Sequence, residues 1–329
     1  MEIHTFHLYY SLLEYYITGL QEGVDCLDFR SLNYVMAIAK YQNITKASEA
    51  LYVGQPTLSK FLIALEQELG VKLFRKIGHR YMLTYAGERY VEKASLILNL
   101  KRDLDAEIAD IVKQDVGVLN VAFANMRCSY MLPAVLPVFR KLHPNIKINV
   151  YEGTSDTNDH RLLDGQVDVA FYTRPAEENP LLEYQALAEE ELLICACHNH
   201  PLCEKAIPNP FSLYPKLQLE DLKDELIVMM RPEQRTRQIL ESILHANKVQ
   251  YENVLYTSNI QAIMGLVANG YGVSFIFDTH LRHRVDPGPI DCYSFGEPRT
   301  QYDFVAAVRK RTYLPHYVQE FIDIVRKAV

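Results

Sequence analysis

The chain has 329 residues and a net charge of −7, and 49% of its residues are hydrophobic. This composition is typical of a globular protein of about two domains and excludes a disordered or collagen-like chain. No apolar run approaches the ~18 residues of a membrane-spanning helix, so we expect no membrane partner.

The first 26 residues carry an apolar residue at every third or fourth position. The series is Ile3, Phe6, Tyr10, Leu13, Ile17 and Leu20. This spacing predicts an extra amphipathic helix over residues 1–26, which packs on the following module or on a second subunit. A start codon assigned too early is the alternative interpretation of this segment.

Residues 43–69 predict two short helices joined by a tight turn. Ala47 is small enough for the second helix to cross the first closely. Gly54 suits the turn, where a residue without a β-carbon can take unusual backbone angles, and Pro56 suits the first turn of the second helix. Because an amphipathic helix pair in an α-helical core would show the same pattern, the pair alone leaves both interpretations open.

The start of the second helix favours DNA binding, because such residues contact the major groove in helix-turn-helix proteins. The Gln55 amide can read adenine, the Thr57 methyl group can contact thymine, and Lys60 suits a phosphate. Residues 70–84 then predict a two-stranded wing. Four basic side chains crowd the turn of this wing: Arg75, Lys76, His79 and Arg80.

Charge is distributed unevenly along the chain. Residues 27–89 hold nine Lys or Arg and five Asp or Glu, a net charge of +4, which leaves −11 on the rest. A basic module joined to an acidic body is expected when only one part of a protein meets nucleic acid.

Residues 85–116 predict one long helix, because no proline interrupts them up to about residue 113. This helix would span roughly 40 Å. Its apolar residues follow a heptad pattern, at Tyr90, Ala94, Ile97, Leu104, Ile108 and Ile111. A single apolar seam on a charged helix must be buried against a second subunit or against its own chain.

From residue 117 onward, predicted strands alternate with helices. The strands lie at 118–123, 146–151, 167–172, 192–197, 226–230, 254–257, 272–277 and 302–308. The helices lie near 131–142, 157–164, 235–247, 260–269 and 315–327. This alternation predicts an α/β fold with parallel sheets.

Five motifs carry a resemblance to a known family. They are Leu27-Asp-Phe-Arg-Ser-Leu, Thr45-Lys-Ala-Ser-Glu-Ala-Leu, Gln55-Pro-Thr-Leu-Ser-Lys, residues 65–75 and residues 83–87. In this order they resemble the LysR-type transcriptional regulators over residues 27–113, with weaker motifs to the C-terminus. Two departures are Gly54, where the family usually has Ser, and Phe61 and Ile63, where polar or basic residues are common.

The resemblance implies a domain plan. A winged helix-turn-helix would occupy residues 27–84 and a linker and dimerisation helix residues 85–116. An effector-binding domain would occupy 117–329, with two α/β subdomains of the type 2 periplasmic-binding-protein class: subdomain I (117–188 and 291–329) and subdomain II (189–290). A homodimer formed by the linker helix, assembled into a homotetramer, is also implied.

By position, the resemblance assigns DNA contacts to ten residues. On the recognition helix they are Gln55, Pro56, Thr57, Ser59 and Lys60, and along the DNA backbone Arg30, Lys46, Arg75, Lys76 and Arg80.

The candidate effector site lies beyond the carboxyl ends of the predicted strands, where open α/β sheets bind ligands. We predict that eight residues line it: Asn125, Arg127, Cys128, Ser129, Thr154, Ser155, Thr173 and Arg231. The forked donors of Arg127 and Arg231 suit an anion such as a carboxylate. Alternatively, these arginines are solvated, or are paired with Glu152, Asp156 or Glu233.

The cysteines and histidines are considered as possible disulfide, redox or metal-binding residues. Six cysteines without a CxxC motif indicate reduced thiols and a cytoplasmic location. Cys128 is a candidate redox sensor if Arg127 lowers its pKa, but no resolving partner is evident, so a structural thiol is the favoured interpretation. The cluster around Cys195, Cys197, His198, His200 and Cys203 is not expected to bind metal, because strand spacing disfavours a tetrahedral cage. His280 and His283 are expected in a surface loop.

No catalytic or cofactor motif occurs in the chain, so we expect neither an enzyme nor a resident cofactor. An exported solute-binding protein would share the α/β body but would not need residues 27–89. The best hypothesis is a DNA-binding transcriptional regulator. Its C-terminal domain would bind a small anionic metabolite and change the oligomer arrangement on promoter DNA. A sensor with weakened DNA binding and a thiol-based redox regulator are the alternatives.

Overall fold

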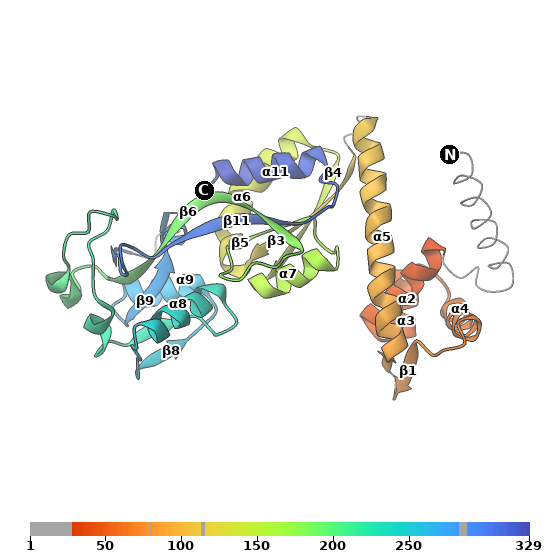
Figure 1. The fold of residues 1–329 in the computed structure, drawn as a ribbon, viewed down its shortest axis with the longest axis horizontal. Coiled ribbons are helices and arrows are strands. Elements are labelled where there is room, and N and C mark those ends of the chain that lie inside the picture. The colour runs from red at the N-terminus through yellow and green to blue at the C-terminus, as the bar shows by residue number, and fades with distance from the viewer. Residues whose placement is uncertain (1–27, 79, 113–115, 283–287) are drawn as a thin grey trace, which may run out of the picture. The chain divides into compact units, whose positions relative to one another are not determined.

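The computed structural model describes residues 28–329, except for 79, 113–115 and 283–287 (Figure 1). The helix predicted over residues 1–26 and the side chains of His79 and His283 therefore lie outside the described residues. The chain forms two compact units that divide after Leu104. No helix of the described part is both long enough and apolar enough to cross a membrane.

The first unit begins with three helices, α2 (Phe29–Tyr41), α3 (Ile44–Ala50) and α4 (Gln55–Glu68). Side-chain caps start the first two helices. The Asp28 carboxylate accepts a hydrogen bond from the Ser31 N–H, and the Asn43 side chain accepts from the N–H groups of Thr45 and Lys46. The three helices bury one apolar cluster, which includes Val35, Ile38, Ala47, Leu58 and Leu65.

The wing follows as two antiparallel strands, β1 (Phe74–Ile77) and β2 (Arg80–Leu83), joined at the predicted turn. A buried carboxylate fixes the wing to α4, because Glu66 Oε1 accepts from the N–H groups of Leu73 and Phe74 at 2.9 and 3.0 Å. Gly87 allows the next helix to approach the wing, since a β-carbon there would lie 2.0 Å from the Leu73 carbonyl oxygen.

Helix α5 (Tyr85–Ile111) contains 27 residues and confirms the predicted long helix. Within the second unit, its end is held to helix α11 (His316–Lys327) and the loop before it. The Asp110 carboxylate accepts from the Tyr313 hydroxyl at 2.7 Å, and the His316 N–H donates to it at 3.0 Å.

The second unit is built on a nine-stranded sheet, in which eight strands follow the order β4-β3-β5-β11-β6-β9-β7-β8 and β10 pairs with β6. The strands are β3 (Gly117–Ala124), β4 (Ile146–Gly153), β5 (Val169–Thr173), β6 (Leu182–Cys197), β7 (Ile227–Met229), β8 (Val254–Tyr256), β9 (Val273–Phe277), β10 (Ile290–Tyr293) and β11 (Gln301–Arg309). Its other helices are α6 (Asn125–Leu142), α7 (Ser155–Leu163), α8 (Arg235–Ala246), α9 (Ile260–Ala268) and α10 (Asp278–Arg282), with short 3₁₀ turns at Pro201–Lys205 and Leu219–Leu222.

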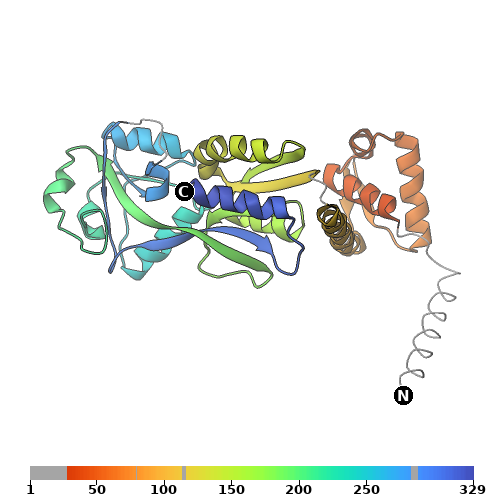
Figure 2. The same ribbon diagram turned by 90° about the horizontal axis from the view of Figure 1, so that it is seen from above.

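Two long strands connect the halves of this unit. β6 pairs with β11 over residues 182–191 and with β9 over 192–195. In Figure 2 these strands, green and blue, run between the two halves. Each half has its own core, with Phe123, Phe171 and Phe321 in one and Phe275 and Phe277 in the other.

The predicted α/β fold is confirmed, with five differences in detail. Parallel pairs occur only within each half, whereas β6 and β11 are antiparallel to their neighbours. β6 begins ten residues before the predicted strand, and α6 begins at Asn125 rather than near residue 131. β10 and α10 were not predicted. Tyr293 and Phe295 pack in the core of the second half, so this half extends beyond residue 290, the predicted end of subdomain II.

Candidate functional site

The start of α4 presents the polar side chains predicted to contact DNA. Gly54 is the N-cap and supplies no side-chain hydrogen bond. Leu58, Leu62 and Leu65 are buried beneath the helix. The opposite side is accessible: Gln55, Pro56, Thr57 and Lys60 are exposed and Ser59 is half-buried. The fold thus brings the five side chains together at one helix end, where they can enter a groove.

The candidate backbone contacts are also accessible. Arg30, Lys46, Arg75, Lys76 and Arg80 are all exposed. Within the described part of the chain, none of these five side chains forms an ion pair. Arg30 lies 5.8 Å from the centroid of the Tyr34 ring, and Lys76 lies 5.9 Å from that of Tyr81. Their charges are therefore available to phosphates.

The two unusual apolar residues of α4 have different environments. Phe61 is half-buried and packs edge-on against Tyr34, with ring centroids 5.0 Å apart. Ile63 is 50% exposed. Phe61 therefore belongs to the core of the first unit, whereas Ile63 belongs to its surface.

The candidate effector site contains an internal ion pair. Arg127 is 2% exposed, and its Nη2 lies 2.8 and 2.7 Å from the two carboxylate oxygens of Glu190. Arg127 also donates to Thr173 Oγ1 at 3.0 Å and to the Tyr130 hydroxyl at 3.1 Å. Burial lowers the pKa of Arg127, but the charge of Glu190 and the interactions with Tyr130 together outweigh this, so the pKa is raised.

Both halves of the second unit contribute to this network. Arg127 comes from the start of α6, Thr173 from the end of β5, and Glu190 from the connecting strand β6. Thr279, on α10 of the other half, donates to Glu190 Oε2 at 2.8 Å. The next residue, His280, packs edge-on against Tyr130 at 5.5 Å between ring centroids. Because His280 is only 3% exposed, its predicted position in a surface loop is wrong.

This network corrects the expected role of Arg127. The alternative to an effector site was pairing with Glu152, Asp156 or Glu233, but the observed partner of Arg127 is Glu190. Glu190 was missed because it is 63 residues from Arg127 in sequence. The signal that could have indicated it is the acidic run of residues 189–191 directly before the apolar residues 192–197. With its charge already neutralised, Arg127 is not an open anion site.

Cys128 is also placed differently from the redox hypothesis. It lies in the core of the first half, and its Sγ donates to the Ala124 carbonyl at 3.8 Å. Burial raises the pKa of this thiol to about 12. A neighbouring Arg127 does not lower it, so Cys128 is placed as the expected structural thiol and not as the alternative redox sensor.

The remaining predicted residues differ in their exposure to solvent. Asn125, Ser129 and Arg231 are exposed, and Ser155 is buried. Thr154 caps α7 by accepting from the Thr157 N–H at 3.2 Å. Among the described residues Arg231 has no ion pair.

Arg235, four residues after Arg231, pairs instead with Asp156 at 2.9 Å. This ion pair joins α8 of one half to α7 of the other. Its two residues are 79 apart in sequence, and no local pattern indicated it.

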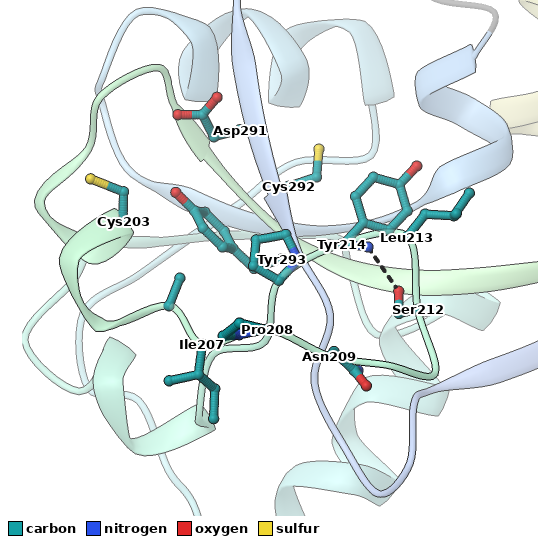
Figure 3. Close-up of a pocket in the computed structure, with 12 residues that line it drawn as sticks. Cys203, Ile207, Pro208, Asn209, Ser212, Leu213, Tyr214, Asp291, Cys292 and Tyr293 are labelled. Atoms are coloured by element: carbon teal, nitrogen blue, oxygen red, sulfur yellow. Dashed lines mark hydrogen bonds between the residues drawn. The ribbon is translucent and has the colours of Figure 1, made fainter.

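A separate pocket lies in the second half, away from the Arg127 network. Its volume is about 700 Å³, and residues 203–215 and 291–293 supply its lining. Figure 3 shows Tyr214, Asp291, Cys292 and Tyr293 around it. Cys195 lies behind the lining, with its Sγ 3.8 Å from that of Cys292. No group of three His, Cys, Asp or Glu side chains that could hold a metal occurs among the residues described.

Comparison with known proteins supports the sequence resemblance. The model of the LysR substrate binding domain matches residues 113–329, and that of the bacterial regulatory helix-turn-helix protein, lysR family, matches residues 29–88. A "Probable RuBisCO transcriptional regulator" of Trieres chinensis is 26% identical over 262 residues, covering 78% of this chain and 82% of its own.

Solved structures of full-length regulators share the fold. An OxyR variant from Pseudomonas aeruginosa has a TM-score of 0.72 at 22% identity, covering 91% of this chain and 95% of that chain. CbnR in complex with its target DNA has a TM-score of 0.59 at 23% identity, with coverages of 92% and 100%. Since one family model alone covers more than half of the residues, the chain belongs to the LysR family of DNA-binding transcriptional regulators, with an effector-binding domain after its helix-turn-helix.

Proposed function

We propose that this regulator binds double-stranded promoter DNA as a homo-oligomer, through the start of α4 and the wing of each subunit. The observation that carries the proposal is the group of exposed side chains at the start of α4. Among the described residues, the side chains of Gln55, Thr57 and Lys60 are exposed and form no hydrogen bond or ion pair. They lie on a module of charge +4, in a chain whose other residues carry −11. The cytoplasmic location stays a prediction from the sequence.

DNA affinity measured against salt concentration tests the proposal. The probes are DNA fragments recovered by a genome-wide pull-down with the full-length protein. We expect Lys60→Ala to weaken all of them and to reduce the slope of log K against log salt by about 0.9 per subunit. Gln55→Ala should instead reduce discrimination between a fragment and its base-substituted copy, by ~1–3 kcal/mol.

The matched control is Lys223→Ala, which removes an exposed lysine from the second unit. Its affinity and salt slope should equal those of the wild type. Equal slopes for Lys60→Ala and Lys223→Ala would contradict the assignment of α4 to the DNA interface.

The second unit is proposed to bind a small anionic effector, for example a carboxylate, at the edge of the Arg127 network. Arg127 and Thr173 are occupied by Glu190, so the anion is assigned to Arg231, which is exposed and has no ion pair among the described residues. The Asp156–Arg235 ion pair supports this location, because it holds the segment of Arg231 close to the capped start of α7. An effector that prefers one arrangement of the two halves would shift the regulator toward that arrangement.

Calorimetry with matched pairs of carboxylates and their neutral amides tests the effector class. We expect binding of a carboxylate but not of its amide. Arg231→Ala should weaken the affinity about tenfold or more, because a charged hydrogen bond contributes ~1.5–3 kcal/mol. Arg140→Ala removes an exposed arginine from the far end of α6 and should leave affinity unchanged. Equal affinity for carboxylate and amide would exclude an anionic effector.

A further inference from the structure

Cys195 and Cys292 form a pair of thiols on neighbouring strands. They are direct partners in the antiparallel register of β6 and β10. Their sulfur atoms are 3.8 Å apart. Paired residues on adjacent antiparallel strands have Cα atoms about 4.5–5.5 Å apart. That range lies within the ~4.4–6.8 Å that a disulfide spans, so the backbone need not move for a bond to form.

The two thiols differ in access to solvent. Cys195 is fully buried, in a core cluster against which Tyr214 and Cys292 pack. Cys292 is half-buried and lines the pocket of about 700 Å³ (Figure 3). A small solute can therefore reach Cys292 from the pocket, while Cys195 lies behind it as the second sulfur. A partly accessible thiol beside a shielded one suits a two-step oxidation.

We propose that Cys195 and Cys292 are a reversible dithiol–disulfide site, oxidised through this pocket by a hydroperoxide. In the first step the Cys292 sulfur attacks the terminal peroxide oxygen and the O–O bond breaks. The alkoxide or hydroxide leaves with the thiol proton as an alcohol or water, and Cys292 becomes a sulfenic acid. In the second step the Cys195 sulfur attacks the Cys292 sulfur. The S–O bond breaks, the hydroxyl leaves with the Cys195 proton as water, and the disulfide forms.

The location of the pair gives the bond a structural effect. β6 carries the chain into the second half of the unit, and β10 is the last strand of that half before β11 returns to the first half. A Cys195–Cys292 bond therefore closes a loop that contains most of that half. Closing so long a loop restricts the unfolded chain, so the oxidised half should resist unfolding more than the reduced one.

Peptide mapping of the full-length protein tests the site. The protein is treated with hydrogen peroxide, its remaining thiols are alkylated, and it is digested without reductant. We expect a linked peptide pair that contains Cys195 and Cys292 and separates on treatment with dithiothreitol. The urea midpoint of the oxidised protein should also be higher, and dithiothreitol should restore the reduced value.

Variants identify the two sulfur atoms. Cys197→Ser with Cys203→Ser removes the nearby thiols and should keep the link. Cys292→Ser should abolish it. Cys195→Ala should leave Cys292 as a sulfenic acid that dimedone labels, which shows the order of the two steps even if this variant is less stable.

Three results would overturn the proposal. They are a link from Cys292 to Cys203, the absence of any link at peroxide levels that oxidise the exposed Cys203, and recovery of Cys292 as a sulfinic acid without a link.

Discussion

The buried Arg127–Glu190 ion pair determines whether the charge of Arg127 is available to a ligand. Both side chains are almost fully shielded, at 2% and 0% exposure. Two opposite charges removed from water gain little over apolar residues, but one unpaired charge in the same place is very unfavourable. Thr173 and Thr279 satisfy further oxygen positions of the carboxylate. The pair therefore acts mainly to specify how the two halves of the second unit meet.

We predict that Glu190→Gln lowers the free energy of unfolding of the second unit by ~3–5 kcal/mol, because Arg127 is left buried without a counter-charge. The double variant Arg127→Met with Glu190→Leu should recover much of that loss. Urea titration followed by far-UV circular dichroism measures both, since the chain has no tryptophan to report by fluorescence. A loss below about 1 kcal/mol in the single variant would mean that the charges are not isolated from water.

At the scale of elements, the sequence predicted correctly those helices whose formation depends on residues close together in the chain. The apolar spacing of α4, the glycine and proline at its start, and the uninterrupted run of α5 each depend on neighbours within a turn or two. These elements were predicted correctly. The first ten residues of β6 were missed because the segment alternates unevenly between half-buried and exposed positions, with Glu183 and Glu189 among them. A strand held by β11 across more than 100 residues leaves no strong local signal.

The same limit explains the candidate sites. The exposed side of α4 follows from its apolar spacing alone, so the sequence is sufficient to predict which side chains at its start are accessible. The sequence could identify Arg127, because it is a polar residue directly after a predicted strand. It could not identify the counter-charge of Arg127, because Glu190 comes from a strand that is distant in the sequence. The expected loop at residues 125–130 is the first turns of α6. Cys128 consequently faces the core rather than a pocket.

At the scale of the whole molecule, α5 has apolar side chains that one subunit does not cover. Leu100 is 68% exposed and Leu104 is 57% exposed, and Leu96, Ile97 and Ile108 share this surface. Exposed large apolar residues repeated along one side of a helix favour pairing with another helix. A DNA-binding module of charge +4 would also gain from a second copy, because the salt-dependent part of the affinity grows with the number of phosphate contacts.

We therefore predict that Leu100→Lys and Leu104→Lys each convert the oligomer to monomers, because a lysine at this seam must be desolvated in the paired helix. Asp105→Lys adds the same side chain one residue after Leu104, where the helical rotation of ~100° directs it away from the seam. This control should assemble as the wild type does. Sedimentation velocity on the full chain reports the assembly, and circular dichroism verifies that α5 remains helical. DNA titration should give a salt slope for the monomers about half that of the dimer, since each subunit supplies its own phosphate contacts. If Leu100→Lys and Leu104→Lys assemble as fully as Asp105→Lys, the seam of α5 is covered by something other than a second subunit.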